Sequence, residues 1–199
     1  MTSPQARPTL FLIVGPNGAG KTTFYETVLK NRVAAPFINA DIIQRDELKD
    51  PSMEASYAAS RIAAERREAH IQKGESFVTE TVFSHRSKLS LIKSAREAGF
   101  RIVMFHLDIV SGDLAVARVK ARISEGGHPV PDEKILQRYA RNKSLIRQAV
   151  LLADAALIFD SSALNTAPRR LAKIAHGRLE LIEDDRPAWF NTLYGDIVG

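Results

Sequence analysis

The sequence contains no cysteine among its 199 residues. Disulfide bridges, zinc or iron–sulfur sites with cysteine ligands, and a cysteine nucleophile are therefore excluded. Glycine and proline are not abundant, with 11 and 9 residues, which excludes a collagen-like or low-complexity chain. A hydrophobic content of 45% and a charged content of 26% instead fit one globular domain of about 100–200 residues.

Long hydrophobic runs are also absent. The longest, residues 10–14, 149–153 and 155–159, are far shorter than the roughly 20 residues that a helix needs to cross a bilayer. Residues 1–9 contain two prolines and no apolar stretch long enough for a signal peptide. We therefore expect a cytoplasmic protein that does not bind a membrane.

Aromatic residues make up only 7% of the chain and form no stripe with basic residues, which disfavours a nucleic-acid surface. The net charge of +5 is concentrated in one segment: residues 118–147 hold eight basic and three acidic residues, and the rest of the chain is balanced. This distribution favours a local anion site over a generally basic face.

Apolar runs alternate with helical patterns, which is typical of βαβ units with a mainly parallel sheet. Strands are expected at residues 9–14, 37–39, 76–80, 101–107 and 155–159, and a sixth near 178–182. Helices are expected at residues 21–31, 53–73, 85–98, 112–125, 132–153 and 169–176. The pattern predicts an α/β three-layer sandwich around a sheet of about five strands.

The domain organisation follows from the same pattern. Residues 9–184 contain no internal repeat or linker and are expected to form one domain. Residues 1–8 are expected to be a flexible N-terminus. The tail, residues 185–199, carries Trp189, Phe190, Leu193 and Tyr194, so we expect it to pack on the domain.

The segment GPNGAGKT at residues 15–22 matches the phosphate-loop pattern G-x-x-x-x-G-K-[ST] at every fixed position. Its glycines let backbone N–H groups curl around phosphate oxygens, and the following helix N-terminus adds positive potential. Lys21 is expected to reach the β- and γ-phosphates, and the Thr22 hydroxyl to ligate Mg²⁺. The sequence thus predicts a site for ATP or GTP formed by Gly15, Pro16, Asn17, Gly18, Ala19, Gly20, Lys21, Thr22 and Thr23.

Acidic residues follow three of the expected strands, where ligands of open α/β sheets bind: Asp41, Glu80 and Asp108. Asp41 is our candidate for the base that accepts a proton from a substrate hydroxyl, with a helix N-cap as the alternative. Glu80 stands in an apolar strand, so its carboxylate requires a ligand or an arginine partner. Asp108 resembles the Mg²⁺-binding aspartate of a Walker B strand, and the alternative is again a helix cap.

The basic segment at 118–147 reads as two helices joined by a Gly/Pro-rich hairpin, a pattern typical of a lid that closes over polyphosphate. Arg122 and Arg138 flank the hairpin and are expected to reach the transferring phosphoryl group, since arginine binds phosphate oxygens in pairs. Arg118 is expected to contact the nucleotide. We expect a solvated face for the other bases, Arg141, Lys143 and Arg147, and a loop position for His128.

Four segments together suggest a family: residues 15–23 (GPNGAGKTT), 39–41 (NAD), 80–84 (ETVFS), and the stretch from Arg122 through Gly126-Gly127-His128 to Arg138-Tyr139. As a set they resemble the zeta toxin family of P-loop kinases, including its shorter bacterial members. The resemblance covers residues 9–162. It implies a P-loop kinase fold that transfers the ATP γ-phosphate to a sugar hydroxyl of a UDP-activated N-acetylated amino sugar. It also implies an antitoxin protein as a partner.

Carried over residue by residue, the resemblance assigns Lys21 and Thr22 to ATP and Mg²⁺ and makes Asp41 the general base. Glu80 becomes a carboxylate that positions the substrate, and Arg122 and Arg138 become the lid arginines. Further substrate contacts are expected from Asn39, Thr81 and Ser84.

Three kinds of function stay open at this point. The first is a small-molecule kinase, whose acceptor is a UDP-sugar or another hydroxyl compound such as a nucleoside or a gluconate-like sugar. The second is a polynucleotide kinase or RNA-binding ATPase, and the third is a nucleotide-dependent switch that hydrolyses slowly without an acceptor. Residues 159–162 either touch the adenine or ribose or form an ordinary exit from the last strand of the core.

Overall fold

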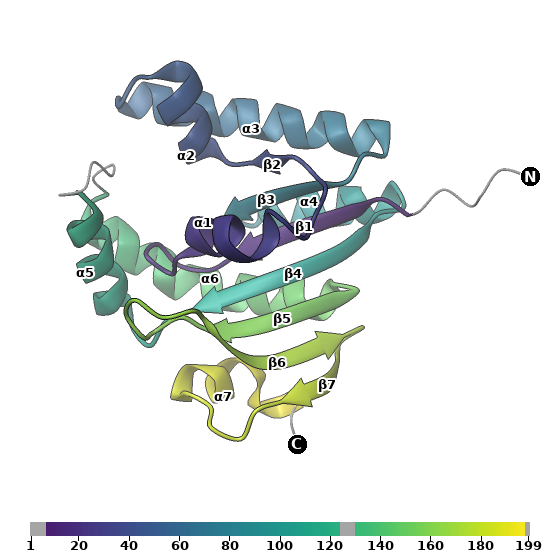
Figure 1. Cartoon of the computed structure of the whole chain (residues 1–199), viewed down its shortest axis with the longest axis vertical. Coiled ribbons are helices and arrows are strands. Elements are labelled where there is room, and N and C mark those ends of the chain that lie inside the picture. The colour runs from purple at the N-terminus through teal and green to yellow at the C-terminus, as the bar shows by residue number, and fades with distance from the viewer. Residues whose placement is uncertain (1–6, 124–129, 198–199) are drawn as a thin grey trace, which may run out of the picture.

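The computed structural model describes residues 7–123 and 130–197. Seven strands form one sheet in the order β2-β3-β1-β4-β5-β6-β7 (Figure 1). The pairs from β2 to β5 are parallel, whereas β6 and β7 run antiparallel to their neighbours. The bounds are β1 Thr9–Val14, β2 Phe37–Ile38, β3 Phe77–Thr81, β4 Arg101–Asp108, β5 Ala155–Asp160, β6 Arg169–Ala175 and β7 Arg178–Ile182.

Strand β1 lies inside the sheet, so both of its faces are buried. Leu10, Leu12 and Val14 belong to one apolar cluster with side chains of α3, α4 and α6, whereas Ile13 belongs to a second cluster with side chains of α1 and α5. Helix α1 covers the front of the sheet in Figure 1, and α4 and α6 lie behind it. A continuous apolar run suits a parallel strand covered on both faces. The expected three-layer α/β fold is therefore confirmed.

The helices begin and end at recognisable signals. Helix α3, Met53–Lys73, is capped by the Ser52 hydroxyl, which accepts from the Ala55 N–H, and ends at Gly74 with a φ of 65°. Two short helices continue as π-helical turns: α1 Lys21–Phe24 continues over Tyr25–Leu29, and α2 Ala40–Ile42 continues over Ile43–Leu48. The other helices are α4 Ser87–Glu97, α5 Gly112–Ile123, α6 Asp132–Leu152 and α7 Ala188–Tyr194. Among residues 7–123 and 130–197, no helix combines the length and the apolar character needed to cross a membrane.

The helix expected at residues 169–176 is wrong, because this segment is β6. His176 and Gly177 both have positive φ, 48° and 72°, and join β6 to β7 as a tight hairpin. Ala175 then pairs with Ala155 of β5. The sheet therefore extends beyond the expected five or so strands, by an antiparallel hairpin at the edge of the parallel part.

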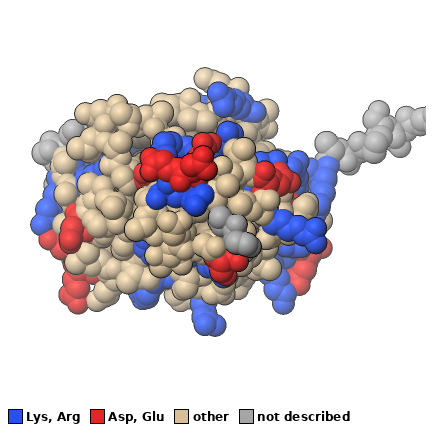
Figure 2. Space-filling view, turned by 90° about the horizontal axis from the view of Figure 1, so that it is seen from below, with Lys and Arg blue, Asp and Glu red and all other residues tan. Residues whose placement is uncertain are grey.

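The tail forms α7 and packs its apolar side chains into the core. Trp189, Phe190, Leu193 and Tyr194 are all buried, and α7 contacts α6. The face that carries β7 and α7 shows acidic and basic side chains interspersed rather than one basic surface (Figure 2). Two ion pairs contribute to it, Lys173–Glu180 and Arg169–Asp185.

Gly15 is required where β1 meets the phosphate loop. Its φ is 148°, and a Cβ at this position would lie 1.9 Å from the backbone oxygen of Leu107 in β4. A backbone atom cannot move aside as a side chain would. We expect Gly15→Ala to lower the free energy of unfolding by about 3 kcal/mol or more, measured by urea denaturation.

Gly74→Ala is the matched control, since its φ is also positive but no atom lies within 4 Å of the added Cβ. Its cost should be about 1–2 kcal/mol, the backbone strain alone. Equal losses in the two variants would show that the close approach to Leu107 is not the constraint.

Candidate active site

The phosphate loop, Gly15–Thr22, follows the carboxyl end of β1 and opens α1. Gly15, Gly18 and Gly20 all have positive φ (148°, 74° and 76°). This run of backbone conformations is accessible to glycine and strained for other residues. The Phe24 N–H donates to the Gly20 oxygen at 2.8 Å, which starts the helix directly behind the loop. The backbone is thus arranged as expected for an anion cradle at a helix N-terminus.

Lys21 is buried at the centre of a group of charges. Its side chain is 8% exposed, and Nζ donates to the Pro16 oxygen across the loop at 3.0 Å. Burial lowers the pKa of Lys21, the carboxylates of Glu80 and Asp41 oppose that effect, and the charges of Arg122 and Arg138 lower it further. The fold therefore brings five sequence-predicted residues from α1, α2, β3, α5 and α6 within electrostatic reach of one another.

Glu80 faces the phosphate loop from β3. The Thr22 hydroxyl donates to its Oε2 at 2.8 Å. Burial raises the pKa of Glu80, whereas Lys21 and the Thr22 hydroxyl favour the carboxylate and oppose the rise. The alternative partner considered from the sequence, an arginine, makes no ion pair with Glu80 within residues 7–123 and 130–197.

Asn39, rather than Asp41, caps the short helix α2. Asn39 Oδ1 accepts from the N–H groups of Asp41 (2.7 Å) and Ile42 (3.3 Å). The Asp41 carboxylate is exposed, and nothing in the described part of the chain donates a hydrogen bond to it. The interpretation of Asp41 as an N-cap is therefore wrong, and its role as a general base stays a prediction. Asn39 Nδ2 is buried without a hydrogen-bonding partner among the described residues.

Asp108 ends β4 in a buried polar network. Its Oδ1 accepts from the Ile109 N–H at 2.8 Å, and its Oδ2 lies 3.4 Å from Lys143 Nζ and 3.6 Å from His106 Nε2. The Tyr194 hydroxyl of α7 hydrogen-bonds His106 Nδ1 at 2.9 Å. Burial raises the pKa of Tyr194 well above its ordinary value, so this phenol stays protonated.

Two bases that we expected on a solvated face belong to this region instead. Lys143 Nζ lies 4.5 Å from the ring centre of Tyr139 and 5.9 Å from that of Trp189, besides its contact with Asp108. Arg147 donates to the Leu193 oxygen at 2.7 Å and pairs with Asp196. Both side chains hold the tail against α6. Arg141 lies exposed, and its one acceptor in the described part of the chain is the Gln137 oxygen.

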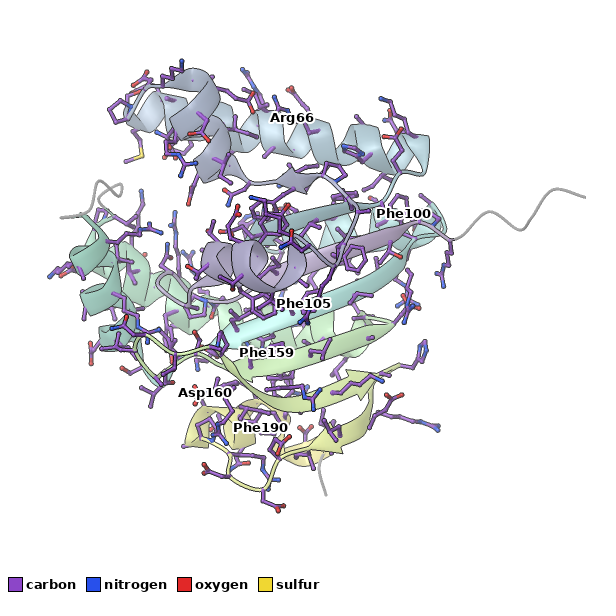
Figure 3. All side chains as sticks on the ribbon, in the orientation of Figure 1. Arg66, Phe100, Phe105, Phe159, Asp160 and Phe190 are labelled. Carbon is purple, nitrogen blue, oxygen red and sulfur yellow. The ribbon has the colours of Figure 1, made fainter. Side chains whose placement is uncertain are left out.

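Arg118 ties the phosphate loop to the segment after β5. Its guanidinium donates to the backbone oxygens of Gly18 (3.3 Å), Ser161 (2.6 Å), Ser162 (2.9 Å) and Ala163 (3.0 Å). With both terminal nitrogens turned to carbonyls, Arg118 holds these loops in place, and its contact with the nucleotide stays a prediction. Asp160, labelled in Figure 3 just beyond Phe159, accepts from the Ser162 N–H at 3.1 Å and keeps this exit loop folded.

Thr81, Ser84 and Thr23 differ in their hydrogen bonds and exposure. Thr81 Oγ1 accepts from the Phe83 N–H at 3.1 Å, and Phe83 has a φ of 58°. Ser84 follows directly and is half-buried, and Thr23 is exposed at the start of α1. The hairpin of the expected lid spans residues 125–131, and its part up to residue 129, with His128, lies outside the described residues.

Sequence reasoning missed His106, Lys143 and Tyr194 as neighbours of Asp108. A histidine in the otherwise apolar strand at 101–107 was the available signal, because a buried imidazole requires partners. Nothing in the local sequence links it to a tyrosine 88 positions later.

Comparisons with known proteins show the family of this chain and its fold. The profile of the AAA domain family AAA_33 matches residues 10–145 of the 199. The chain belongs to this family. The matched region contains the phosphate loop, Asp41, Glu80, Asp108, Arg122 and Arg138. An uncharacterized protein of Haemophilus influenzae is 27% identical over 125 residues, which make up 63% of this chain and 88% of that protein.

Solved structures show the same P-loop kinase-like fold. The AvrRxo1-ORF1:-ORF2 complex with ATP has a TM-score of 0.65 at 18% identity and covers 97% of this chain. The PezAT toxin–antitoxin system of Streptococcus pneumoniae has a TM-score of 0.62 at 13% identity and covers 99% of this chain and 81% of that one. This AAA_33 protein spans only 64% of the AvrRxo1 chain. At these identities the likeness concerns the fold alone.

The coupling between Lys21 and Glu80 is testable without any ligand. Lys21→Met removes the ammonium that favours the Glu80 carboxylate, so the pKa of Glu80 should rise further above its ordinary range. Carboxyl-detected NMR titration of the folded protein measures this shift. Lys30→Met, which removes an exposed partner of Glu26 on the same helical segment, should leave Glu80 unchanged. A Glu80 pKa that is the same in both variants would contradict the coupling.

Proposed function

We propose that this AAA_33 protein is an ATP-dependent phosphotransferase that moves the γ-phosphate to a hydroxyl of a small molecule. The observation that carries the proposal is the environment of Lys21. Two carboxylates and two arginines act on its charge in a buried position beside the phosphate loop. A hydrolysis-only switch has no need of an exposed, unpartnered carboxylate there, whereas a kinase requires a base such as Asp41.

The residues present fit ATP with Mg²⁺. The loop N–H groups and Lys21 would hold the β- and γ-phosphates, and the adjacent oxygens of Thr22 and Glu80 form the donor set that a hard cation prefers. Asp108 suits this role less well, because its two oxygens already face the Ile109 N–H and Lys143. When bound, Mg²⁺ would neutralise charge that develops on the phosphates.

We propose the following roles for the other side chains in the transfer. Asp41 takes the proton of the acceptor hydroxyl, the acceptor oxygen forms a bond to the γ-phosphorus, and the bond from that phosphorus to the β-bridging oxygen breaks to leave ADP. Arg122 and Arg138 stabilise the charge on the three transferred oxygens. Glu80, Asn39, Thr81 and Ser84 would orient the acceptor, and the free Nδ2 of Asn39 is a donor available for it.

For the acceptor we propose a UDP-activated N-acetyl amino sugar. The support is the resemblance of four segments of the sequence to zeta toxins, together with the fold shared with a toxin–antitoxin system. The basic segment 118–147 would attract such a doubly charged substrate. An antitoxin partner is proposed on the same grounds. The test has three competing outcomes: the acceptor is another sugar or a nucleoside, the acceptor is a polynucleotide, or the protein uses no acceptor.

The protein with Mg²⁺ and ATP should release ADP faster when UDP-N-acetylglucosamine is present than with water alone. The sugar nucleotide should also gain the mass of one phosphate. Nucleosides, gluconate and oligonucleotides with free hydroxyl ends serve as competing acceptors. Stimulation by one of these but not by UDP-amino sugars would retain the kinase and reject the UDP-sugar; stimulation by none would favour the switch.

Asp41→Asn separates binding from chemistry in the same assay. The amide keeps the size of the side chain but cannot accept the proton, so acceptor-dependent turnover should fall by about 10²–10⁴-fold while ATP affinity stays near that of the wild type. Asp46→Asn is the matched control, since Asp46 lies on the continuation of α2 and pairs with Arg45 away from Lys21. Turnover of Asp41→Asn within a few-fold of the wild type would remove Asp41 from the mechanism.

A further inference from the structure

A pocket of about 270 Å³ lies between α3 and α4. We call it the α3–α4 pocket. Its polar lining consists of two basic side chains, three serines and one acid: Arg67, Lys88, Ser87, Ser90, Ser94 and Glu68. The phosphate-transfer chemistry proposed above uses none of these residues. The volume lies just below that of pockets for drug-sized ligands, so it suits a small occupant.

Arg67 lines this pocket as a buried residue, and no acidic side chain pairs with it within residues 7–123 and 130–197. Its side chain is 9% exposed, and its one hydrogen bond within the described chain goes to the Thr79 hydroxyl at a long 3.5 Å. Burial lowers its pKa, and no acidic group opposes that effect. The preceding residue, Arg66, labelled on α3 in Figure 3, is paired with an acid. Its two terminal nitrogens make a bidentate ion pair with the two carboxylate oxygens of Glu47, each at 2.6 Å.

Lys88 adds a second cation beside the first. Burial and the charge of Arg67 both lower the pKa of Lys88, and it makes no ion pair in the described part of the chain. Glu68 is the one acid of the lining, and its Oε1 accepts from Gln72 at 3.2 Å along α3. A buried guanidinium beside a half-buried ammonium is costly in the free protein when neither is paired with a carboxylate, as is the case among the described residues. An anion in the pocket would remove that cost.

The serines of α4 supply hydroxyls on the same side. Ser87, Ser90 and Ser94 are spaced by three and four residues, so they lie along one helix face. Ser87 Oγ contacts His85 Nδ1 at 2.9 Å, whereas the hydroxyls of Ser90 and Ser94 make no hydrogen bond within the described chain. Guanidinium, ammonium and hydroxyl groups around one small space are the donors that bind phosphate oxygens.

The pocket is separate from the phosphate loop. Thr79 and Glu80 are adjacent in β3, so their side chains point to opposite faces of the sheet. Thr79 contacts Arg67 on the face covered by α3 and α4, whereas Glu80 contacts Thr22 on the face covered by α1. A ligand beside Arg67 therefore lies across the sheet from a nucleotide held by Lys21.

We propose that the α3–α4 pocket is a second anion site, which binds a phosphate group, either as free phosphate or as the phosphate of a small monoester. Arg67 holds two of its oxygens, and Lys88 and the serines of α4 hold the others. Bound phosphate joins α3 to α4. Phosphate binding in this pocket does not depend on the phosphotransferase reaction, so a binding measurement alone tests it.

The test measures binding of inorganic phosphate, and separately of glycerol 3-phosphate, by calorimetry with a saturating non-hydrolysable ATP analogue and Mg²⁺. Arg67→Met and Lys88→Met should each weaken binding at least tenfold. Lys93→Met, on α4 but paired with Glu97, should stay within twofold of the wild type, and so should Lys21→Met. Tighter binding of glycerol 3-phosphate identifies a monoester as the occupant, and tighter binding of phosphate identifies the free ion.

Loss of phosphate binding in Lys21→Met alone would place the anion at the phosphate loop and overturn the proposal. Equal binding by the wild type, Arg67→Met and Lys88→Met would overturn it as well. Thermal unfolding controls for folding: without phosphate, Arg67→Met should melt at or above the wild-type temperature, because it loses an uncompensated buried charge. Phosphate should raise the melting temperature of the wild type and leave that of Arg67→Met unchanged. If Arg67→Met does not fold, Lys88→Met decides the outcome.

Discussion

The charge of Lys21 is the constraint on which the rest of the active site depends. An ammonium group buried at the end of a central strand is unfavourable unless carboxylates and acceptors surround it. Glu80, Asp41 and the Pro16 oxygen supply them, from three different elements. The close approach of Gly15 to Leu107 fixes the start of the loop against β4, and Arg118 fixes its middle against the segment after β5. Backbone contacts and Arg118 thus hold the loop, so the charges of Lys21, Glu80 and Asp41 are not needed to fix its position.

The sheet separates two sets of polar groups. On the α1 face, two acids and two arginines act on the charge of Lys21. On the α3–α4 face, Arg67 and Lys88 make no ion pair with an acid within residues 7–123 and 130–197, and there we propose a second anion site. Helix α7 also packs against the carboxyl ends of the strands. Tyr194 contacts His106, and Trp189 lies near Lys143. His106 and Lys143 both lie beside Asp108. This support comes from residues beyond the region matched by the family.

Several elements could be predicted from the sequence because their signals are local. The phosphate loop follows from its glycines, and the bounds of α3 follow from Ser52 and Gly74. For strand β6 the sequence predicts a helix, because RRLAKIA is too short to distinguish the periodicity of a helix from that of a strand. The His176–Gly177 turn, which decides between them, follows the segment. The partners of Asp108 and the carbonyl contacts of Arg118 depend on segments far apart in the chain, which no local pattern reveals.

The most direct test of the central claim is a crystal structure with Mg²⁺ and a non-hydrolysable ATP analogue. The account predicts the β- and γ-phosphates against the loop at residues 15–22, with Lys21 Nζ turned from the Pro16 oxygen to the phosphates and the cation beside Thr22 and Glu80. The carboxylate of Asp41 should face the γ-phosphate across a gap wide enough for an acceptor hydroxyl. A triphosphate bound elsewhere, or one at the loop with Asp41 and Glu80 turned away from it, would contradict the account.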